Sequence, residues 1–277
     1  MKLKFRIAEL NIQIETDFDI LNSGFSRAFV SDFEKSDINI FVRLGEINRT
    51  GELLYSSERC DVISSNGKHT VVIKDRQFKC DFFSVEQTEN EYNCIISNEA
   101  DENARDVFYI WNNVGLSHIM LENSRIIFHG SCVIYEDKAV IFSGKSGIGK
   151  STQADLWAKH ENAEIINGDK IILMQKEDKL FAGSLPIAGT SGICQNKIAQ
   201  VKAIIFLEQS TENQICELSP AQKAGMLTSN CSYDLWQKND IIKALDLSTA
   251  FFDKTEIYSY KCRADKSAVD YLKAVIK

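Results

Sequence analysis

The segment GKSGIGKS at Gly144–Ser151 carries the most specific chemical pattern in the chain. It matches G-x-x-x-x-G-K-[ST] at every fixed position, a pattern typical of loops that bind the phosphates of a nucleotide. Glycines let successive backbone N–H groups converge on a phosphate without obstruction by a Cβ atom. Lys150 supplies an ammonium group for the β- and γ-phosphates, and the Ser151 hydroxyl suits Mg²⁺. We therefore expect a nucleoside triphosphate and Mg²⁺ as ligands of this loop.

The residues expected to contact the nucleotide form one unbroken run. They are Gly144, Lys145, Ser146, Gly147, Ile148, Gly149, Lys150, Ser151 and Thr152. The pattern does not distinguish ATP from GTP, because contacts to the base come from loops that it does not place.

Two further residues are candidates for chemistry on the phosphates. Asp169 follows the apolar stretch Glu164–Asn167, where a carboxylate could hold the metal beside Ser151. An Asn-Gly-Asp turn is the alternative explanation for this aspartate. His129 stands between two expected strands, and an imidazole can move protons at such a site. A histidine at the end of a strand can equally be a hydrogen-bonded packing residue.

The elements around the loop suit the phosphate-binding interpretation. Ala139–Ser143 is an apolar strand directly before the loop, and Thr152–His160 has the character of a helix directly after it. A strand–loop–helix unit points the positive end of the helix at the bound anion. Other strands are expected at Arg125–Phe128, Cys132–Tyr135, Glu164–Asn167, Lys170–Met174, Leu180–Leu185 and Lys202–Leu207, with helices at Asp101–His118 and Ala264–Lys277.

The first hundred residues have a β-rich character, and their apolar residues alternate clearly from Leu3 to Ile14. The alternation changes phase near Ala8–Glu9, which predicts a bulge or turn, and Asn66–Gly67 predicts a second turn. We therefore predict a β-rich lobe over residues 1–100 and an α/β domain with a mixed sheet over residues 101–277. Strands in the first lobe are expected at Ile38–Arg43, Thr70–Lys74 and Tyr92–Ser97.

Composition limits the classes of partner. The chain has 277 residues, 44% hydrophobic and 26% charged, with a net charge of −7, which disfavours a broad nucleic-acid or anionic-membrane surface. No stretch approaches the roughly 20 apolar residues of a membrane-spanning helix. The eight cysteines form no Cys-x-x-Cys pair, and the first residues do not have the pattern of a secretion signal. We expect a cytoplasmic protein with reduced thiols, no nucleic-acid partner and no membrane partner.

Three blocks together resemble the HPr kinase/phosphorylase family and its relatives with a phosphoenolpyruvate-carboxykinase-like nucleotide-binding fold. They are His129-Gly130, then GKSGIGKST at 144–152, then IINGDK at 165–170, and they span about a third of the chain. The resemblance implies a P-loop nucleotide-binding core over residues 101–277, preceded by the β-rich lobe. It also implies an ATP-dependent phosphotransferase that acts on a serine hydroxyl, with His129, Lys150 and Asp169 as catalytic residues and Ser151 and Asp169 at the metal.

The chain departs from the resembling family at two places. The family has a pair of adjacent aspartates, whereas this chain has Gly168-Asp169, so only the second position matches. The family's later glycine motif carries an arginine, and the corresponding segment Ala188–Ile193 has none. The glycine-rich stretch Gly183–Lys197 is the expected acceptor-side element, with Ser191 and Lys197 as candidate phosphate contacts; a plain connection is the alternative.

Three functions follow as hypotheses. The first is a kinase-like phosphotransferase that moves the γ-phosphate to a hydroxyl of an unknown peptide or small molecule, since relatives of this kind also occur beside peptide-modification systems. The second is a nucleotide-binding regulatory module with little or no transfer, which Gly168 favours. The third is a hydrolase that drives motion, for which no sensor arginine is visible. The resembling family forms oligomers, so a homo-oligomer is also expected.

Overall fold

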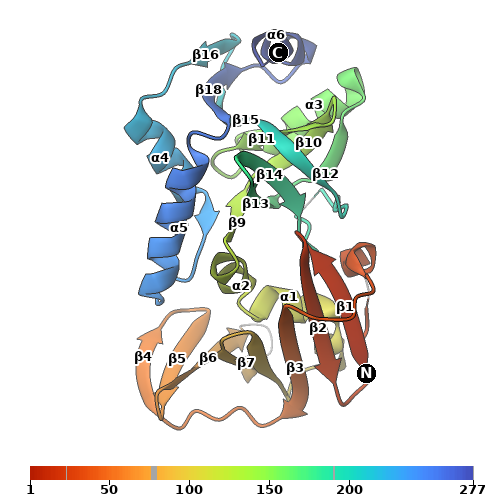
Figure 1. Ribbon diagram of the computed structural model, residues 1–277, viewed down its shortest axis with the longest axis vertical. Helices are drawn as coiled ribbons and strands as arrows, with labels where there is room; N and C mark the ends of the chain where they lie inside the picture. The colour runs from red at the N-terminus through yellow and green to blue at the C-terminus, as the bar shows by residue number, and fades with distance from the viewer. Residues whose placement is uncertain (23, 76–79, 190, 277) are drawn as a thin grey trace. The chain divides into compact units, whose positions relative to one another are not determined.

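The computed structural model describes residues 1–22, 24–75, 80–189 and 191–276, which form two compact units, Met1–Leu116 and Ser117–Lys277 (Figure 1). Each unit is built on its own mixed sheet, and helices join the strands. The expected α/β class with mixed sheets is therefore confirmed. Within those four ranges, the helices are too short or too polar to cross a bilayer.

The first unit is a mixed sheet whose strands run in the order β1-β2-β3-β8-β7-β6-β5-β4. The pairs β2–β3 and β3–β8 are parallel, and the other neighbours are antiparallel. The strands are β1 Lys2–Ile7, β2 Leu10–Thr16, β3 Ile38–Gly45, β4 Glu52–Ser56, β5 Cys60–Ser65, β6 Lys68–Asp75, β7 Cys80–Thr88 and β8 Glu91–Ser97. Short helices η1 Gly24–Phe29, η2 Glu102–Arg105 and α1 Val107–Asn113 complete it.

Both turns expected in this unit are present and have left-handed backbone conformations. Ala8 and Glu9 have φ of 46° and 66° between β1 and β2, and Asn66 and Gly67 have φ of 52° and 78° between β5 and β6. Two consecutive residues with positive φ match the twist of flanking antiparallel strands. The phase change in the apolar pattern near Ala8 is thus a hairpin turn, because the strand that follows reverses direction.

Helix α1 explains why the first unit ends later than residue 100. The indole N–H of Trp111 donates to the Ser26 hydroxyl at 3.1 Å, and its ring meets that of Phe5 at a centroid distance of 5.2 Å. Trp111 and Ile110 are buried against this sheet unit. A helix that the sequence placed with the second domain therefore packs into the first unit.

A buried carboxylate organises the β4–β5–β6 end of the first unit. Asp61 is 7% exposed and accepts from Arg49 at 2.9 Å, Lys74 at 2.7 Å and the Ser56 hydroxyl at 2.7 Å. Burial raises the pKa of Asp61, but the bonds from Lys74, Ser56 and Arg49 together outweigh burial and lower the pKa to about 2. The ionised carboxylate of Asp61 on β5 therefore connects β4, through Ser56, with β6, through Lys74.

The second unit has a ten-stranded sheet among its described residues. Its main path runs β12-β10-β11-β15-β14-β13-β9-β17, and β18 pairs with both β15 and β16. The strands are β9 Arg125–His129, β10 Ser131–Tyr135, β11 Lys138–Ser143, β12 Glu164–Asn167, β13 Lys170–Lys176, β14 Lys179–Ser184, β15 Ile198–Gln209, β16 Gln214–Cys216, β17 Cys231–Ser232 and β18 Glu256–Cys262. The helices are α2 Leu116–Glu122, α3 Lys150–Glu161, α4 Pro220–Ser229, α5 Lys238–Phe251 and α6 Lys266–Val275.

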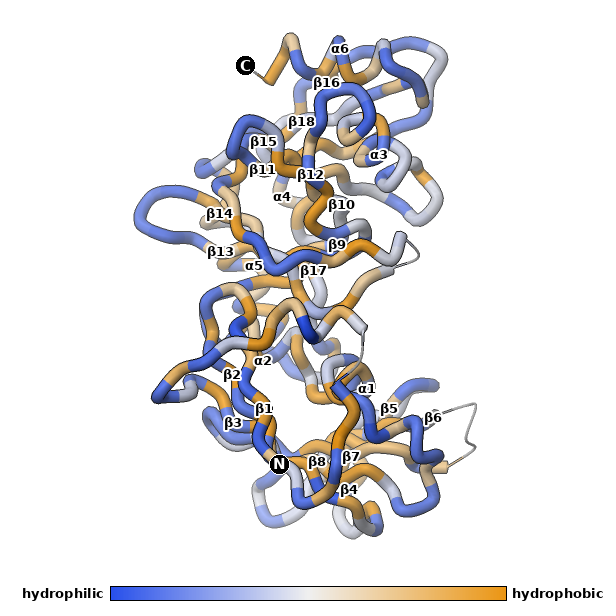
Figure 2. The backbone as a smooth tube through the Cα atoms, turned by 90° about the vertical axis from the view of Figure 1, so that its right-hand side faces the viewer, coloured by the Kyte–Doolittle hydropathy of each residue, from blue (hydrophilic) through white to orange (hydrophobic). Residues whose placement is uncertain are grey.

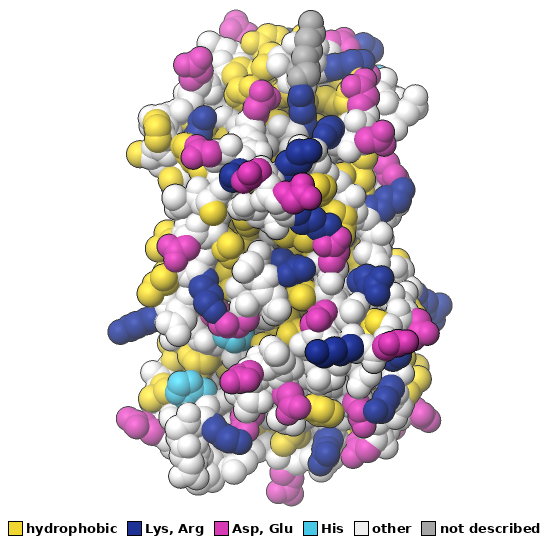
Figure 3. Space-filling model, viewed as in Figure 1, with side chains coloured by type: hydrophobic (Ala, Val, Ile, Leu, Met, Phe, Trp, Pro, Cys, Tyr) yellow, Lys and Arg dark blue, Asp and Glu magenta, His cyan; other side chains and the backbone are white. Residues whose placement is uncertain are grey.

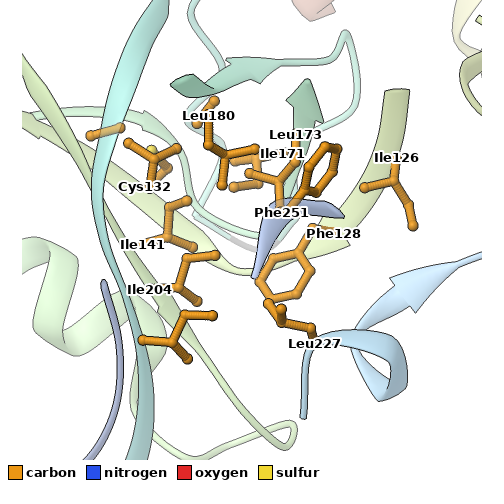
Figure 4. Packing of buried hydrophobic residues seen from close by; sticks show 14 of the residues in the cluster. Ile126, Phe128, Cys132, Ile141, Ile171, Leu173, Leu180, Ile204, Leu227 and Phe251 are labelled. Atoms are coloured by element: carbon orange, nitrogen blue, oxygen red, sulfur yellow. The ribbon is translucent and has the colours of Figure 1, made fainter. Parts of the chain in front are cut away.

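The strands β11 and β15 are parallel and covered on both faces. Ile141 and Ile204 belong to one core cluster, shown in Figure 4 with Leu227 and Phe251 from α4 and α5. Phe142 and Ile205, one position along, belong to a second cluster that includes residues of α3 and α6. Burial on both faces explains the unbroken apolar run of β11, since alternation would leave polar residues inside. The strands of both units carry hydrophobic stretches separated by hydrophilic turns (Figure 2).

The elements around the loop agree with the sequence expectations, and those between residues 216 and 262 were not foreseen. Helices α4 and α5 pack side by side, as do α3 and α6 (Figure 1). Helix α4 begins with a capping box in which the Ser219 and Gln222 side chains satisfy each other's backbone N–H groups. Helix α6 begins after the capping residue Asp265, within the expected range, and Lys277 lies outside the described residues. On the face drawn in Figure 3, basic and acidic side chains are interspersed.

Candidate functional site

The loop between β11 and α3 depends on three glycines. Gly144, Gly147 and Gly149 have φ of 134°, 77° and 111°, a region that residues with a Cβ rarely adopt. An added Cβ at Gly147 or Gly149 would meet nothing within 4 Å, so these two positions require glycine for conformation and leave open space above the backbone. The loop therefore presents bare backbone on its outer side, as a phosphate cradle needs.

Lys150 is the first residue of helix α3, and its side chain folds back over the loop. Its ammonium group donates to the carbonyl oxygens of Gly144 at 3.1 Å and Lys145 at 3.2 Å. In the described structure the helix has Gly149 as its N-cap and no side-chain cap bond, so N–H groups of its first turn are left for another acceptor. The ammonium group and these N–H groups together can bind an anion.

A hollow of about 280 Å³ adjoins the loop. It is lined on one side by Gly147, Ile148, Gly149, Thr152 and Gln153, and on the other by Gln209, Ser210, Cys262, Arg263 and Ala264. The Gln209 amide donates to the Gly147 carbonyl at 3.3 Å, and the Gln153 amide donates to the Arg263 carbonyl at 2.9 Å. The ends of β15 and β18 therefore complete the hollow, and the sequence analysis did not identify these residues.

Asp169 lies in the turn from β12 to β13, which the buried Asn167 side chain holds. The Asn167 Oδ1 atom accepts from the backbone N–H groups of Asp169 at 2.9 Å and Lys170 at 3.0 Å. The Asp169 carbonyl in turn accepts from the Gly130 N–H at 2.9 Å. The Ser131 hydroxyl donates to the Gly168 carbonyl at 2.7 Å. The turn is therefore bonded on both sides, and its aspartate is held in a fixed place.

The glycine-rich stretch after β14 packs directly on this turn. A Cβ at Gly189 would come within 2.6 Å of the Asp169 Cβ, so only glycine fits beside this aspartate. A Cβ at Gly168 would come within 2.7 Å of the Ser191 Cβ and closer still to its Oγ. Ser191 thus fills the space beside Gly168, where the resembling family has an aspartate. Thr190, between these residues, lies outside the described residues.

His129 ends β9, and its Cα pairs with that of Lys170 across the sheet. Burial lowers the pKa of the His129 imidazole, and the charges of Lys170 and Lys150 lower it further against the opposing charge of Asp169. The imidazole is therefore neutral at pH 7 and can accept a proton. Hydrogen bonds connect this strand end to the other two segments: the Gly130 N–H donates to the Asp169 carbonyl at 2.9 Å, and the Ser143 hydroxyl, directly before the loop, donates to the His129 carbonyl at 2.6 Å.

These hydrogen bonds connect the segments that carry His129, Asp169 and the loop, whereas the Lys197 ammonium group is engaged elsewhere. Lys197 forms an ion pair with Glu164 at 2.5 Å, at the opposite end of β12 from Asp169, about 10 Å along the strand. Lys170 is the neighbour that sequence reasoning missed. The register of β9 on β13 brings it beside His129, and no local pattern reveals that register.

These residues suit a magnesium nucleotide. Ser151 and Asp169 offer a hydroxyl and a carboxylate, the oxygen ligands that Mg²⁺ prefers. The uncovered backbone over Gly147 and Gly149 and the ammonium group of Lys150 suit the phosphates. The donor set and the space therefore agree with the ligands expected from the sequence.

The fold is of the mixed α/β class, and comparison with known families assigns the chain more narrowly. The family model described as "SynChlorMet cassette protein ScmC" matches residues 93–266, and the chain belongs to this family. No curated protein matches the chain.

One similar solved structure is the HPr(Ser) kinase/phosphatase from Coxiella burnetii. It has 17% sequence identity and a TM-score of 0.25, over 34% of this chain and 64% of that chain. This chain therefore spans less than two thirds of that protein. The kinase activity in that name belongs to that protein.

Proposed function

We propose that the chain is a phosphotransferase that uses ATP or GTP with Mg²⁺ and moves the γ-phosphate to a hydroxyl of a peptide or small molecule. The observation that carries the proposal is a loop with three glycines at positive φ, capped by Lys150 and hydrogen-bonded through neighbouring residues to the segments of His129 and Asp169. Phosphoryl transfer depends mainly on positioning and on charge, so a site with few residues is sufficient.

In this proposal each residue has a limited task. The backbone N–H groups of the loop and the first turn of α3 bind the β-phosphate, and Lys150 exchanges its bonds to the Gly144 and Lys145 carbonyls for phosphate oxygens. Ser151 and Asp169 hold Mg²⁺, which when bound offsets the negative charge that develops on the phosphates. The hollow beside Thr152 and Gln153 receives the rest of the nucleotide.

His129 is the candidate base for the acceptor hydroxyl. Its imidazole is partly buried, and burial lowers its pKa, so it is neutral at pH 7; the charge of Asp169 acts on this pKa in the opposite direction. The stretch from Gly183 to Lys197 is the candidate acceptor-side element, because Gly189 and Ser191 pack against the Asp169 turn. An acceptor held by this stretch would therefore lie near Asp169.

A regulatory nucleotide-binding module is the second candidate, and one observation favours it. Ser191 fills the space beside Gly168, so the site has one carboxylate where the resembling family has two. A site with a single carboxylate can still bind Mg²⁺ and nucleotide, whereas activation of a hydroxyl then depends on His129 alone.

Turnover separates the two candidates. The protein would be incubated with Mg²⁺-ATP, then Mg²⁺-GTP, together with a pool of serine-containing peptides and small alcohols, and the products would be analysed by mass spectrometry. A gain of one phosphate on an acceptor, lost in Asp169→Asn and reduced in His129→Gln, supports transfer. Nucleotide binding without any phosphorylated product, in wild type and both variants, supports the regulatory module.

A further inference from the structure

Helices α2 and α5 of the second unit bring together three side chains that can bind a metal, on elements separate from the phosphate loop. His118 and Glu122 are four residues apart on α2 and so share one face of the helix. Asp240 lies in the first turn of α5. One ligand atom from each residue lies within 4.8 Å of the other two. These residues are far apart in sequence, and the helix packing alone assembles them.

Asp240 is the unusual member of this group. Its carboxylate is 0% exposed, and its Oδ1 lies 2.8 Å from the Nδ1 atom of His118. Its Oδ2 is also buried and has no hydrogen-bond partner among the residues that the structure describes. A buried carboxylate oxygen without a partner is strongly unfavourable, and proteins normally pair such groups or bind them to a metal.

We propose that His118, Glu122 and Asp240 form a binding site for one divalent transition-metal ion of the Zn²⁺ type. Ligands about 2.1 Å from a metal, at angles between 90° and 110°, are roughly 3.0 to 3.4 Å apart, close to the observed separation of His118 and Asp240. Imidazole favours Zn²⁺ and related ions over Mg²⁺ and Ca²⁺. Three protein ligands leave a fourth position for water.

The charges of the group agree with a divalent ion. The two carboxylates carry two negative charges, and Lys243 offsets one of them from the solvent side, so the group keeps a negative charge that attracts a cation. Lys243 pairs with the Glu122 Oε2 at 2.5 Å, toward solvent, and this carboxylate has a second oxygen for a metal. The direct contact between His118 and the Asp240 Oδ1 leaves the Asp240 Oδ2 without a partner in the described part of the chain, and the ion pair with Lys243 engages one oxygen of Glu122. The metal accounts for all three side chains.

The proposed ion would connect α2 to α5 within one unit. Because the ligand atoms meet only when both helices are packed, the ion binds the folded chain in preference to the unfolded one and stabilises it. The expected role is therefore structural, and it does not depend on nucleotide chemistry at the phosphate loop.

The test uses the full chain, freed of metal with a chelator, in the absence of nucleotide. Zn²⁺ alone is titrated by calorimetry, and Co²⁺ is titrated by visible absorption, which reports its coordination. Wild type is expected to bind one ion of each. His118→Ala and Glu122→Gln are expected to bind Zn²⁺ at least about 100-fold more weakly, since loss of even an indirect metal partner costs 10- to 100-fold. Glu122 is partly exposed, so its variant keeps the fold while testing the ligand.

Two histidine variants serve as matched controls. His160→Ala, on α3, and His129→Ala, beside the phosphate loop, are expected to bind Zn²⁺ as wild type does. Excess Zn²⁺ is expected to raise the melting temperature of wild type and of both controls, but not that of His118→Ala. Equal Zn²⁺ affinity in wild type and His118→Ala, or loss of the bound ion in His129→Ala instead, would overturn the proposal.

Discussion

Replacing Asn167 with alanine tests whether this buried amide holds the Asp169 turn. The Asn167 side chain accepts from two backbone N–H groups, of Asp169 and Lys170, and its Nδ2 donates to the Ser184 hydroxyl at 3.2 Å and the Ile187 carbonyl at 3.0 Å. The residue is 0% exposed. Alanine removes four hydrogen bonds at once, and three partly buried backbone groups and the Ser184 hydroxyl lose a partner.

The magnitude follows from those four bonds. A net contribution of about 1 kcal/mol for each bond predicts a loss near 4 kcal/mol, and partial entry of water would reduce it to about 3 kcal/mol. This is a large part of the 5–15 kcal/mol that stabilises a typical domain. Ser184→Ala removes one of the four bonds to Asn167 and the bond that the hydroxyl donates to the Ile166 carbonyl at 3.3 Å, so it is the graded control, with an expected loss of about 2 kcal/mol.

Urea denaturation provides the measurement, monitored by the intrinsic tryptophan fluorescence, to which the buried Trp157 of α3 contributes. We expect a large fall in the urea midpoint for Asn167→Ala and a smaller one for Ser184→Ala. In Mg²⁺-ATP titrations, Asn167→Ala should lose most of the Mg²⁺-dependent part of binding, because the Asp169 turn is no longer held. An unfolding midpoint for Asn167→Ala equal to that of Ser184→Ala would refute this reasoning.

Three further predictions concern other parts of the chain. Gly168→Ala should destabilise the protein by about 1–3 kcal/mol, because its Cβ overlaps Ser191, and a double variant with Ser191→Gly should recover most of the loss; additive effects in denaturation would contradict this. Asp61→Asn should lower stability at pH 7. The lowered pKa of Asp61 makes the wild type more stable than Asp61→Asn by about 2 kcal/mol above pH 3.8. This difference in the free energy of unfolding should disappear as the pH falls through about 2, which urea denaturation at each pH would measure. Gly149→Ala should weaken nucleotide binding, measured by calorimetry, because a residue with a Cβ is strained at the φ of 111° found there, although the added Cβ would meet no other atom. Unchanged affinity would contradict the role of this glycine.

The sequence was informative where the pattern is local. The apolar run before Gly144 and the glycine spacing are both confined to one strand–loop–helix unit, and β11 and α3 lie where they were expected. The hairpin turns at Ala8 and Asn66 were likewise readable from neighbouring residues. Such elements can be predicted from neighbouring residues alone, without knowledge of the tertiary structure.

The features that were missed depend on long-range packing. Lys170 comes beside His129 only through the register of two strands, and Arg263 joins the hollow only because β18 pairs with β15. Two missed features did have a local signal. Ser219 with Gln222 is a capping box before α4, and the spacing of His118 and Glu122 places them on one helix face.

Binding of nucleotide at the loop is the central claim, and calorimetric titration with Mg²⁺-ATP and Mg²⁺-GTP tests it most directly. Wild type and Lys150→Ala would be compared with and without Mg²⁺. We expect binding of one nucleotide that strengthens with Mg²⁺ and weakens by about 10- to 100-fold in Lys150→Ala, the equivalent of one charge-assisted contact of 1.5–3 kcal/mol. Equal affinity of the variant and wild type, or no binding of either nucleotide by wild type, would contradict the assignment of the loop.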